Sequence, residues 1–517
     1  MTTSKDREAI RATLLLIFIG FIIRVAVSGQ FLLVPDETNY WQWSRYLDLG
    51  YQDHPPMIAW TIWLSTQLFG QNEIAVRLPT IIGLSVASIY MALLAGRIFS
   101  WQTAFHATLL SQGILLFNGA AMIATPDGML LPCWAGASYH AYRALKENRM
   151  QQWLLTGFWF GVGLLSKYTV LLFLPSLLLC IIAAKPFRNR LFQPAPWVGL
   201  FLGLLVFTPV ILWNINNEWA TFRHVLYMSG INESGFFTLK YIVDYVAEQL
   251  ALLSPVVFVF ILIAWVIWTR KNDFLNADIH FLTWTSLPTF LAFLLLSLHS
   301  RVYGNWPAAG YLTAIVLITS IYGPTGSLGK KRESRGWKIA VITAYLMTVP
   351  VLIQVIYPLV PLPVQYDRTA RETIGWDTLG QAVHETVQTM PDKEDVFIFG
   401  IRYQIASELA FYMPGRPRTV SINRWTRPNV YDYWFDDSIL IGRNGVGVTE
   451  HKIYIQLLEL VFDDVVIDRE VPIYRYSPLL GQELVTTFYI FRSYGFKGGQ
   501  RWQPIILDDI RATKKQT

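Results

Sequence analysis

The sequence predicts a mainly α-helical, polytopic membrane protein with about 11 transmembrane helices and a C-terminal α/β domain outside the membrane. Composition gives the first indication: of 517 residues, 53% are hydrophobic and 15% are charged, whereas soluble domains average about 25% charged residues. Apolar runs recur along residues 1–356, and none of spanning length follows in residues 357–517. We therefore expect a transmembrane domain over 1–356 and a soluble domain over 357–517.

The transmembrane helices are predicted from the apolar runs, because a hydrocarbon core about 30 Å thick needs about 20 apolar residues in a helix. The first run is too long for the apolar region of a signal peptide and is interpreted as a retained span. The expected spans lie near residues 13–34, 79–96, 103–123, 128–142, 152–166, 168–184, 196–213, 249–268, 279–298, 306–322 and 337–356.

The orientation is predicted from Lys and Arg, which accumulate in cytoplasmic loops. With these spans, 17 Lys and Arg residues lie on one side and six on the other. Breaks at Pro126 and Lys167 are needed for this separation. The N-terminus is therefore predicted to be cytoplasmic, and an odd number of spans places the tail outside. There, DVFIFGI from Asp395, RTVSI from Arg418 and TTFYIF from Thr486 are typical of strands, and Gln404 to Tyr412 of a helix.

Composition also excludes several classes of protein. The net charge of +6 is small and scattered, which does not indicate a nucleic-acid binder. Cys133 and Cys180 lie in apolar runs, so neither a disulfide framework nor a CxxC motif is present. Gly157 and Gly161 suit close helix packing within the membrane. Arg24 falls inside the first span, and we expect it to form an ion pair with a neighbouring helix.

The first outer loop, near residues 35–79, is both polar and aromatic. Helical spacing places Asp36, Tyr40, Trp43 and Leu47 on one face, which is typical of a segment in the plane of the membrane interface. An aromatic belt is the alternative for the rings. It does not account as well for Asp36 and Glu37, which directly follow the first span.

Other titratable residues of the outer loops gather at the same membrane face. Asp127 lies in a very short turn, where a turn or cap role is the alternative, and Lys167 could otherwise be a snorkelling helix end. Acids that take a proton, beside cations that neutralise phosphate, are what transfer of a group from a lipid phosphate requires. The candidate cations and histidines are His54, Lys167, Arg223, His224 and Arg301.

Several motifs together carry a family resemblance. They are PDETNYWQWS with GYQDHPP, TPDGMLLP, GLLSKYT, NWPAAGY and, in the tail, YQIASELAFYMPGRPR followed by NVYDYW. In order and placement, they resemble bacterial membrane glycosyltransferases with the GT-C fold, of the protein mannosyltransferase and aminoarabinose transferase-like superfamily (glycosyltransferase family 39-like). The resemblance runs from about residue 13 into the tail.

The resemblance implies inverting transfer of a sugar from a polyprenyl phosphate to a lipid, glycan or protein acceptor at the outer face of a bacterial cytoplasmic membrane. Asp36, beside Glu37, matches the family's first-loop acid and would be the general base. Asp127 matches its second acid and would position the acceptor or support charge on the sugar. Tyr40 and Trp43 would close over the sugar, with Arg223 as a further substrate contact.

The leaving phosphate needs cations rather than a general acid, and His54, Lys167 and Arg301 are the candidates. The aminoarabinose transferases carry a lysine before their paired prolines, whereas this chain has Asp53-His54-Pro55-Pro56, which argues against that same substrate. His54 suits phosphate when protonated or a metal when neutral. A divalent metal at His54 and Glu37 is therefore an open alternative, and no other cofactor is expected.

The tail motif, with Tyr403, Gln404, Ser407, Tyr412, Pro414 and Arg416, is interpreted as core packing or as facing the acceptor, and so are Asp432 and Trp434. The competing hypothesis for the whole chain is a transporter or flippase of lipid-linked glycans. Transporters concentrate polar groups and broken helices near the midplane, whereas these spans are nearly free of charge. A non-catalytic scaffold would need neither Asp36 nor Asp127.

Overall fold

The structure, a computed structural model, describes residues 3–228, 239–270, 276–324, 333–360, 362–422, 429–479 and 481–498. These residues form two compact units. Unit 1 contains the described residues up to Ser28 and Leu47–Leu352, and unit 2 contains Gly29–Tyr46 and the described residues from Ile353 onward. The first part of the expected outer loop thus belongs to the same unit as the tail. Four basic residues used for the orientation, Lys271, Lys330, Lys331 and Arg332, lie outside the described ranges.

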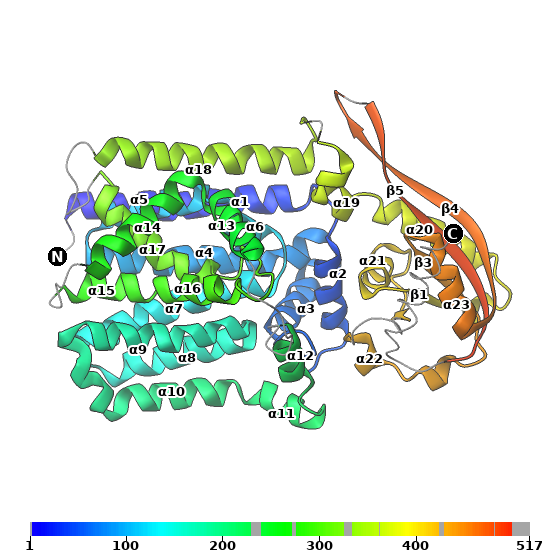
Figure 1. The fold of residues 1–517 in the computed structure, drawn as a ribbon, viewed down its shortest axis with the longest axis horizontal. Coiled ribbons are helices and arrows are strands. Elements are labelled where there is room, and N and C mark those ends of the chain that lie inside the picture. The colour runs from blue at the N-terminus through cyan, green and yellow to red at the C-terminus, as the bar shows by residue number, and fades with distance from the viewer. Residues whose placement is uncertain are drawn as a thin grey trace. The chain divides into compact units, whose positions relative to one another are not determined.

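Unit 1 is built of helices, most of which run side by side (Figure 1). Helices begin where their sequences provide caps: the side chains of Asn72 and Ser100 accept hydrogen bonds from the backbone N–H groups of Ala75 and Thr103. The helices are α1 (Ser4–Ser28), α3 (Met57–Phe69), α4 (Glu73–Ile98), α5 (Trp101–Gly113), α6 (Leu115–Met122), α7 (Pro126–Glu147), α8 (Met150–Ser166), α9 (Phe173–Ala183), α10 (Pro194–Val206), α11 (Thr208–Asn216), α12 (Ala220–Met228), α13 (Lys240–Leu253), α14 (Pro255–Arg270), α15 (Ala277–Trp284), α16 (Leu287–Leu296), α17 (Tyr311–Tyr322) and α18 (Glu333–Ile356).

The protein is an integral membrane protein with several apolar spans. Four stretches are long and apolar enough to cross a bilayer, namely Ser4–Ser28, Glu73–Ile98, Ala277–Leu296 and Arg335–Ile356, and two bent helix pairs raise the number to six among the described residues. The structure therefore supports a coarser picture than eleven spans. The breaks expected at Pro126 and Lys167 are present, because α7 begins at Pro126 and α8 ends at Ser166.

Two expected spans are broken by proline. The run 249–268 was predicted as one span, but α13 and α14 meet at an angle of 111°, with Ser254 at a φ of 76° directly before Pro255. The run 196–213 bends by 45° between α10 and α11, next to Pro209. Proline lacks the N–H that would continue the helical hydrogen bonds, so both predictions of a continuous helix were wrong at these points.

The glycines Gly157 and Gly161 bring α8 against α10, as the sequence predicted. A Cβ atom on Gly157 would lie 1.8 Å from the Gly199 carbonyl oxygen, and one on Gly161 would lie 2.6 Å from that of Gly203. The four glycines therefore allow backbone-to-backbone contact between the two helices.

Arg24 is buried, and two side-chain amides hold its guanidinium. Its Nε donates to Asn118 Oδ1 at 3.0 Å, and its Nη2 donates to Gln112 Oε1 at 2.8 Å. The amides lie on either side of the break between α5 and α6. The predicted ion pair is replaced by hydrogen bonds to neutral partners.

Unit 2 has one five-stranded sheet in the order β2-β1-β3-β5-β4. β1 is parallel to β2 and β3, whereas β5 is antiparallel to β3 and β4, so the expected α/β domain contains a mixed sheet. The predicted strands near 395, 418 and 486 and the helix over 404–412 are all present. The elements are α2 (Pro35–Arg45), α19 (Arg368–Thr373), α20 (Trp376–Gln388), β1 (Phe397–Gly400), α21 (Tyr403–Tyr412), β2 (Thr419–Ser421), α22 (Tyr431–Trp434), β3 (Gly445–Thr449), α23 (Ile455–Val461), β4 (Phe462–Ser477) and β5 (Gly481–Phe496).

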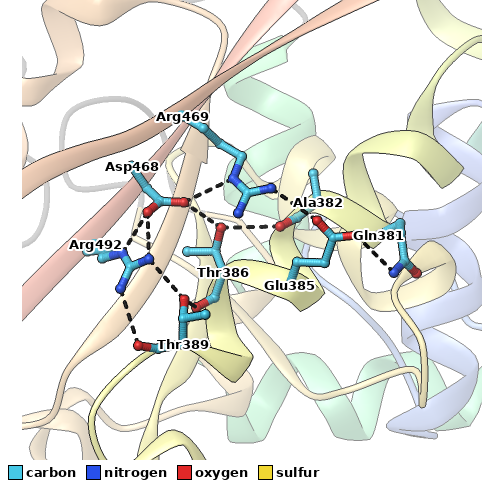
Figure 2. A network of polar contacts seen from close by, with 8 residues as sticks. All are labelled: Gln381, Ala382, Glu385, Thr386, Thr389, Asp468, Arg469 and Arg492. Atoms are coloured by element: carbon cyan, nitrogen blue, oxygen red, sulfur yellow. Dashed lines mark hydrogen bonds and ion pairs between the residues drawn. The ribbon is translucent and has the colours of Figure 1, made fainter.

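Helices cover both faces of this sheet. Ile398 of β1 packs in a core that includes α20 and α21, and its neighbour Phe399 packs with α23, as the alternation of side chains along a strand requires. A polar network also fixes α20 to the long β4–β5 hairpin (Figure 2). At its centre, Asp468 accepts hydrogen bonds from Thr386, Arg469 and Arg492.

Candidate active site

The clearest polar cluster of unit 1 is the pair of Asp127 and Lys167. Asp127 lies in the first turn of α7, where the helix dipole favours an acid, and Lys167 directly follows α8. The Lys167 Nζ lies 2.7 Å from Oδ1 and 2.8 Å from Oδ2 of Asp127, and both side chains are buried. The sequence assigned these residues separate tasks, whereas the structure brings them together.

A third member of this cluster, Asn305, was not singled out from the sequence. Its side-chain nitrogen donates to Asp127 Oδ2 at 2.9 Å. The loop that carries Asn305 is fixed by α13, because Gln249 donates to the Gly304 carbonyl at 3.2 Å and Tyr311 donates to Gln249. The sequence motif NWPAAGY could have indicated Asn305 as a candidate, because it places this polar residue shortly before the apolar helix α17.

A second polar contact of unit 1 joins the loop after α2 to α12. His224 Nε2 lies 3.2 Å from Asp53 Oδ1, and both side chains are largely buried. Thr221 donates to the backbone carbonyl of Tyr51 at 2.9 Å. His54 follows Asp53 and is half-buried. The loop that carries the predicted phosphate ligand His54 is therefore held in place by α12.

The other predicted cations of unit 1 are exposed. Arg301 lies over the ring of Tyr303, with 5.4 Å between its Cζ and the ring centroid. Arg223 forms an ion pair of 3.3 Å with the equally exposed Glu218. The hydrogen bonds of the Asp127 cluster are made by Lys167 and Asn305, and the roles of Arg301 and Arg223 stay predictions.

Helix α2 carries the two acids of the first loop. Proline at its first position, Pro35, suits a helix start. Asp36 is exposed in the first turn. Glu37 is buried, and its carboxylate accepts a hydrogen bond from the Val34 backbone N–H at 3.0 Å. Glu37 thus stabilises the start of α2, and its catalytic and metal-binding roles stay predictions.

The aromatic residues of α2 are packed. Tyr40 and Trp43 are buried, with an edge-to-face contact of 4.9 Å between their ring centroids. Trp41 packs edge-to-face on Phe411 at 4.9 Å. In this conformation the rings expose little surface to a substrate, so contact of Tyr40 and Trp43 with a sugar stays a prediction.

Residues of the tail motif contact α2. Gln42 donates to Thr419 Oγ1 at 3.2 Å and to the Tyr431 hydroxyl at 3.1 Å, and the Tyr431 and Ser407 hydroxyls lie 3.0 Å apart. Burial raises the pKa of Tyr431, so its phenol stays neutral. The buried cluster of Gln42, Ser407, Thr419 and Tyr431, here called the α2 clamp, belongs wholly to unit 2.

Further contacts reinforce the α2 clamp at both ends of the helix. Before it, the Leu33 N–H donates to the Tyr412 hydroxyl at 2.6 Å. After it, the ring of Tyr46 stacks on Trp434 with 4.6 Å between centroids. Arg45 donates to the backbone carbonyl of Arg416 at 3.1 Å. Tyr412, Arg416 and Trp434, which the sequence left between core packing and acceptor contact, therefore contact α2 or the residues next to it.

A metal site was left open by the sequence. Among the residues that the structure describes, no group of three or more His, Cys, Asp or Glu side chains is placed to hold an ion. Glu37 belongs to unit 2 and His54 to unit 1. A divalent metal at these residues stays a prediction.

A family comparison matches one segment of the chain. Residues 53–213, which include Asp127 and Lys167, match the family described as dolichyl-phosphate-mannose-protein mannosyltransferase. The matched segment includes His54, begins after Asp36 and ends before Arg223.

Two similar relatives are bacterial. The lipid A galacturonosyltransferase RgtD of Rhizobium johnstonii is 28% identical over 317 residues, which is 59% of this chain and 64% of the relative. The undecaprenyl phosphate-alpha-4-amino-4-deoxy-L-arabinose arabinosyl transferase of Pseudomonas aeruginosa is 29% identical over 183 residues, or 32% of this chain and 33% of that protein. The chain thus spans less than two thirds of the length of these relatives.

The fold extends the likeness to nearly the whole chain. ArnT from Cupriavidus metallidurans, in the crystal structure with undecaprenyl phosphate, superimposes with a TM-score of 0.64 at 13% sequence identity, over 93% of this chain and 97% of ArnT. The apo structure of ArnT gives a TM-score of 0.62. This chain therefore has an ArnT-like fold, with a mainly helical membrane part and a C-terminal mixed sheet.

Proposed function

We propose that this protein transfers a sugar from a polyprenyl phosphate to an acceptor hydroxyl at the outer face of the bacterial cytoplasmic membrane, with inversion at the anomeric carbon. The observation that carries the proposal is the buried cluster of Asp127, Lys167 and Asn305, two of whose members lie in the segment that matches the mannosyltransferase family. Burying a charged group costs free energy unless the group is paired. A buried ion pair at the ends of membrane helices is therefore suited to binding a polar substrate.

The two bacterial relatives indicate which donor and which acceptor suit this chain. An undecaprenyl phosphate-linked sugar suits a chain similar to the arabinosyl transferase, and lipid A suits a chain similar to RgtD. Other lipids, glycans or proteins are the competing acceptors. We expect eleven spans with a cytoplasmic N-terminus, so that residues 36, 127 and 167 all reach the outer face.

In the proposed reaction, Asp36 takes the proton of the acceptor hydroxyl while its oxygen bonds to the anomeric carbon. The bond from that carbon to the phosphate oxygen breaks, and the polyprenyl phosphate leaves with the electron pair. Asp36 lies in the first turn of α2 and is exposed. Asp127 orients the acceptor or supports positive charge on the sugar, because Lys167 and Asn305 fix its carboxylate.

Charge on the departing phosphate is balanced by cations, which suits His54, Lys167 and Arg301. Lys167 already neutralises Asp127, so its ammonium would be shared between the carboxylate and the phosphate. Arg301 is exposed, and its long side chain can reach a phosphate at the membrane surface. We propose that the sugar is contacted by Tyr40, Trp43 and Arg223. Because Tyr40 and Trp43 are buried, this contact requires α2 to change its position.

The test is mass spectrometry of lipids and envelope glycans from cells with and without the gene, and from cells that carry Asp36→Asn or Asp127→Asn. The transferase predicts that the sugar-phosphate lipid accumulates without the gene, that a glycan or lipid acceptor is lighter by one sugar, and that neither variant restores it. The matched control is Asp392→Asn, because Asp392 is exposed and has a φ of 49°, which asparagine tolerates.

Two outcomes would contradict the proposal. Full rescue by Asp36→Asn would remove the proposed base. Unchanged acceptors, with the sugar-phosphate lipid redistributed between the two membrane faces, would favour the alternative transporter or flippase.

A further inference from the structure

The end of the β4–β5 hairpin presents an apolar face to its surroundings. Tyr474 and Tyr476 of β4 are 47% and 70% exposed, Leu484 of β5 is 49% exposed, and Leu479 of the turn is 71% exposed. Tyr474 pairs directly with Leu484 across the two strands. These four residues, here called the hairpin tip, form an apolar patch of a kind that usually marks an interaction surface.

The charges of this part of the hairpin lie on its opposite face. Side chains alternate along a strand, so Arg475, between the two exposed tyrosines, is buried, and so is Ser477 after Tyr476. Arg475 pairs with Glu483 of β5 at 2.7 Å and with Asp367 at 2.6 Å. Arg475 is therefore neutralised by Glu483 of the hairpin and by Asp367, which directly precedes α19, and the four residues of the hairpin tip carry no charge.

Contacts within unit 2 tie the same hairpin to the chain that leaves the membrane. Ser477 donates to the Pro358 carbonyl at 3.4 Å, and Arg475 donates to the carbonyl of Leu362. These acceptors closely follow α18, which ends at Ile356 and contains the span Arg335–Ile356. The connecting segment also exposes Tyr357 and Val360. The hairpin is thus attached next to the point where a spanning helix must reach the membrane surface.

We propose that the hairpin tip inserts into the headgroup region of the bilayer that α18 crosses. Tyrosine is enriched at this level because its ring is apolar and its hydroxyl remains hydrated. Leucine gains by leaving water for the acyl boundary. Unit 2 would then have an attachment to the membrane besides its covalent connections, and this attachment would hold the α2 clamp close to the lipid surface.

The experiment uses the full-length protein in nanodiscs of phosphatidylethanolamine and phosphatidylglycerol. Leu479→Cys is labelled with an environment-sensitive fluorophore, since the native Cys133 and Cys180 are both buried. Tyr476→Cys is the second probe. Glu394→Cys is the matched control, because Glu394 is exposed within a charged stretch of the same unit. Quenching is measured with lipids that carry a shallow nitroxide and with aqueous iodide.

If the hairpin tip lies in the headgroup region, we expect at least about twofold stronger quenching by the nitroxide lipid at both tip positions than at position 394, as interfacial burial requires. Iodide should show the reverse order. Tip labels that iodide quenches as strongly as the control label would overturn the proposal. Protection from both quenchers would also overturn it, since a protein surface or a second copy of the chain would then cover the tip.

Discussion

Lys167 donates to both carboxylate oxygens of Asp127, at 2.7 and 2.8 Å, although the two residues are 40 positions apart. Asp127 lies in the first turn of α7, and Lys167 directly follows α8. Each would be a buried unpaired charge without the other. The α7 and α8 ends that carry them are consequently fixed in relation to each other by electrostatics as well as by packing. The pair is therefore both a structural link and the centre of the proposed site.

Removing one partner of this pair should destabilise unit 1 strongly. Asp127→Asn and Lys167→Met are each expected to cost about 3 to 5 kcal/mol, because a buried charge loses its partner. The double variant should cost less than the sum, since no unpaired charge remains. Thermal unfolding of the purified protein measures the three changes.

The matched control for this cycle is Lys146→Met. Lys146 pairs with Asp278 at 2.5 Å, but both side chains are about one third exposed, and such pairs contribute about 0 to 1 kcal/mol. Additive effects of the two substitutions at 127 and 167 would show that the ion pair contributes no coupling energy.

Loss of the Tyr431 hydroxyl should loosen α2 without unfolding the sheet. Tyr431→Phe removes one of the two hydroxyl groups to which Gln42 donates and leaves the Thr419 hydroxyl, at an expected cost of about 1 to 2 kcal/mol. The rate of amide hydrogen exchange should rise in residues 35–45. The base on α2 is then less well positioned, so kcat should change by a larger factor than the KM for the donor.

The control for the α2 clamp is Tyr366→Phe, which removes a hydroxyl from a residue that is 76% exposed in the same unit. It should change neither hydrogen exchange nor kcat. If Tyr431→Phe left the exchange of residues 35–45 at the wild-type rate, the α2 clamp would have no role in holding the helix.

Local sequence features predicted much of this fold. The apolar stretches from Asp395 and from Thr486 indicated strands, because such signals depend on neighbours in the chain. The break at Pro126 followed from the distribution of Lys and Arg between the loops. The break at Ser254 was missed although Pro255 indicated it, since an apolar run of spanning length outweighed one proline in the interpretation. Hydropathy reports the length of a run and not its direction.

Contacts between distant residues could not be predicted in the same way. Asp127 and Lys167 were identified as candidates from their chemistry, but nothing in their spacing indicated an ion pair. Gln42 and Tyr431 are 389 positions apart, so no periodicity connects them. The amide partners of Arg24 were likewise hidden, because neutral Gln112 and Asn118 carry no charge pattern to read.

A methyl group at Gly157 should force α8 and α10 apart. Gly157→Ala would place a Cβ atom 1.8 Å from the Gly199 carbonyl oxygen, and overpacking of this kind costs about 1 to 3 kcal/mol or more. Gly119→Ala is the control, because no atom lies within 4 Å of a Cβ there and alanine favours a helix by about 0.5 to 1 kcal/mol. A wild-type thermal midpoint for Gly157→Ala would contradict the close approach of the two helices.

The network around Asp468 should make unit 2 sensitive to acid. Partial burial acts to raise the pKa of Asp468, but hydrogen bonds from Thr386, Arg492 and Arg469 outweigh it, and the pKa is lowered overall. Because the unfolded carboxyl then binds a proton at a higher pH than the folded one, this contribution to stability is full above the unfolded value, about pH 4. It is lost as the pH falls through the lower, folded value.

Asp468→Asn tests this dependence. The variant should be less stable than the wild type at pH 7 by about 1 kcal/mol, a figure that allows for solvent screening of a half-buried group. The difference should shrink as the pH falls below about 4, because the wild type loses the same interactions when its carboxyl is protonated. Asp464→Asn, an exposed position on the same strand, is the control. Linkage requires the difference in free energy of unfolding between Asp468→Asn and the wild type to follow the protonation of the Asp468 carboxylate. If that difference stayed constant from pH 7 to about pH 3, the carboxylate charge would not stabilise the contact between α20 and the hairpin.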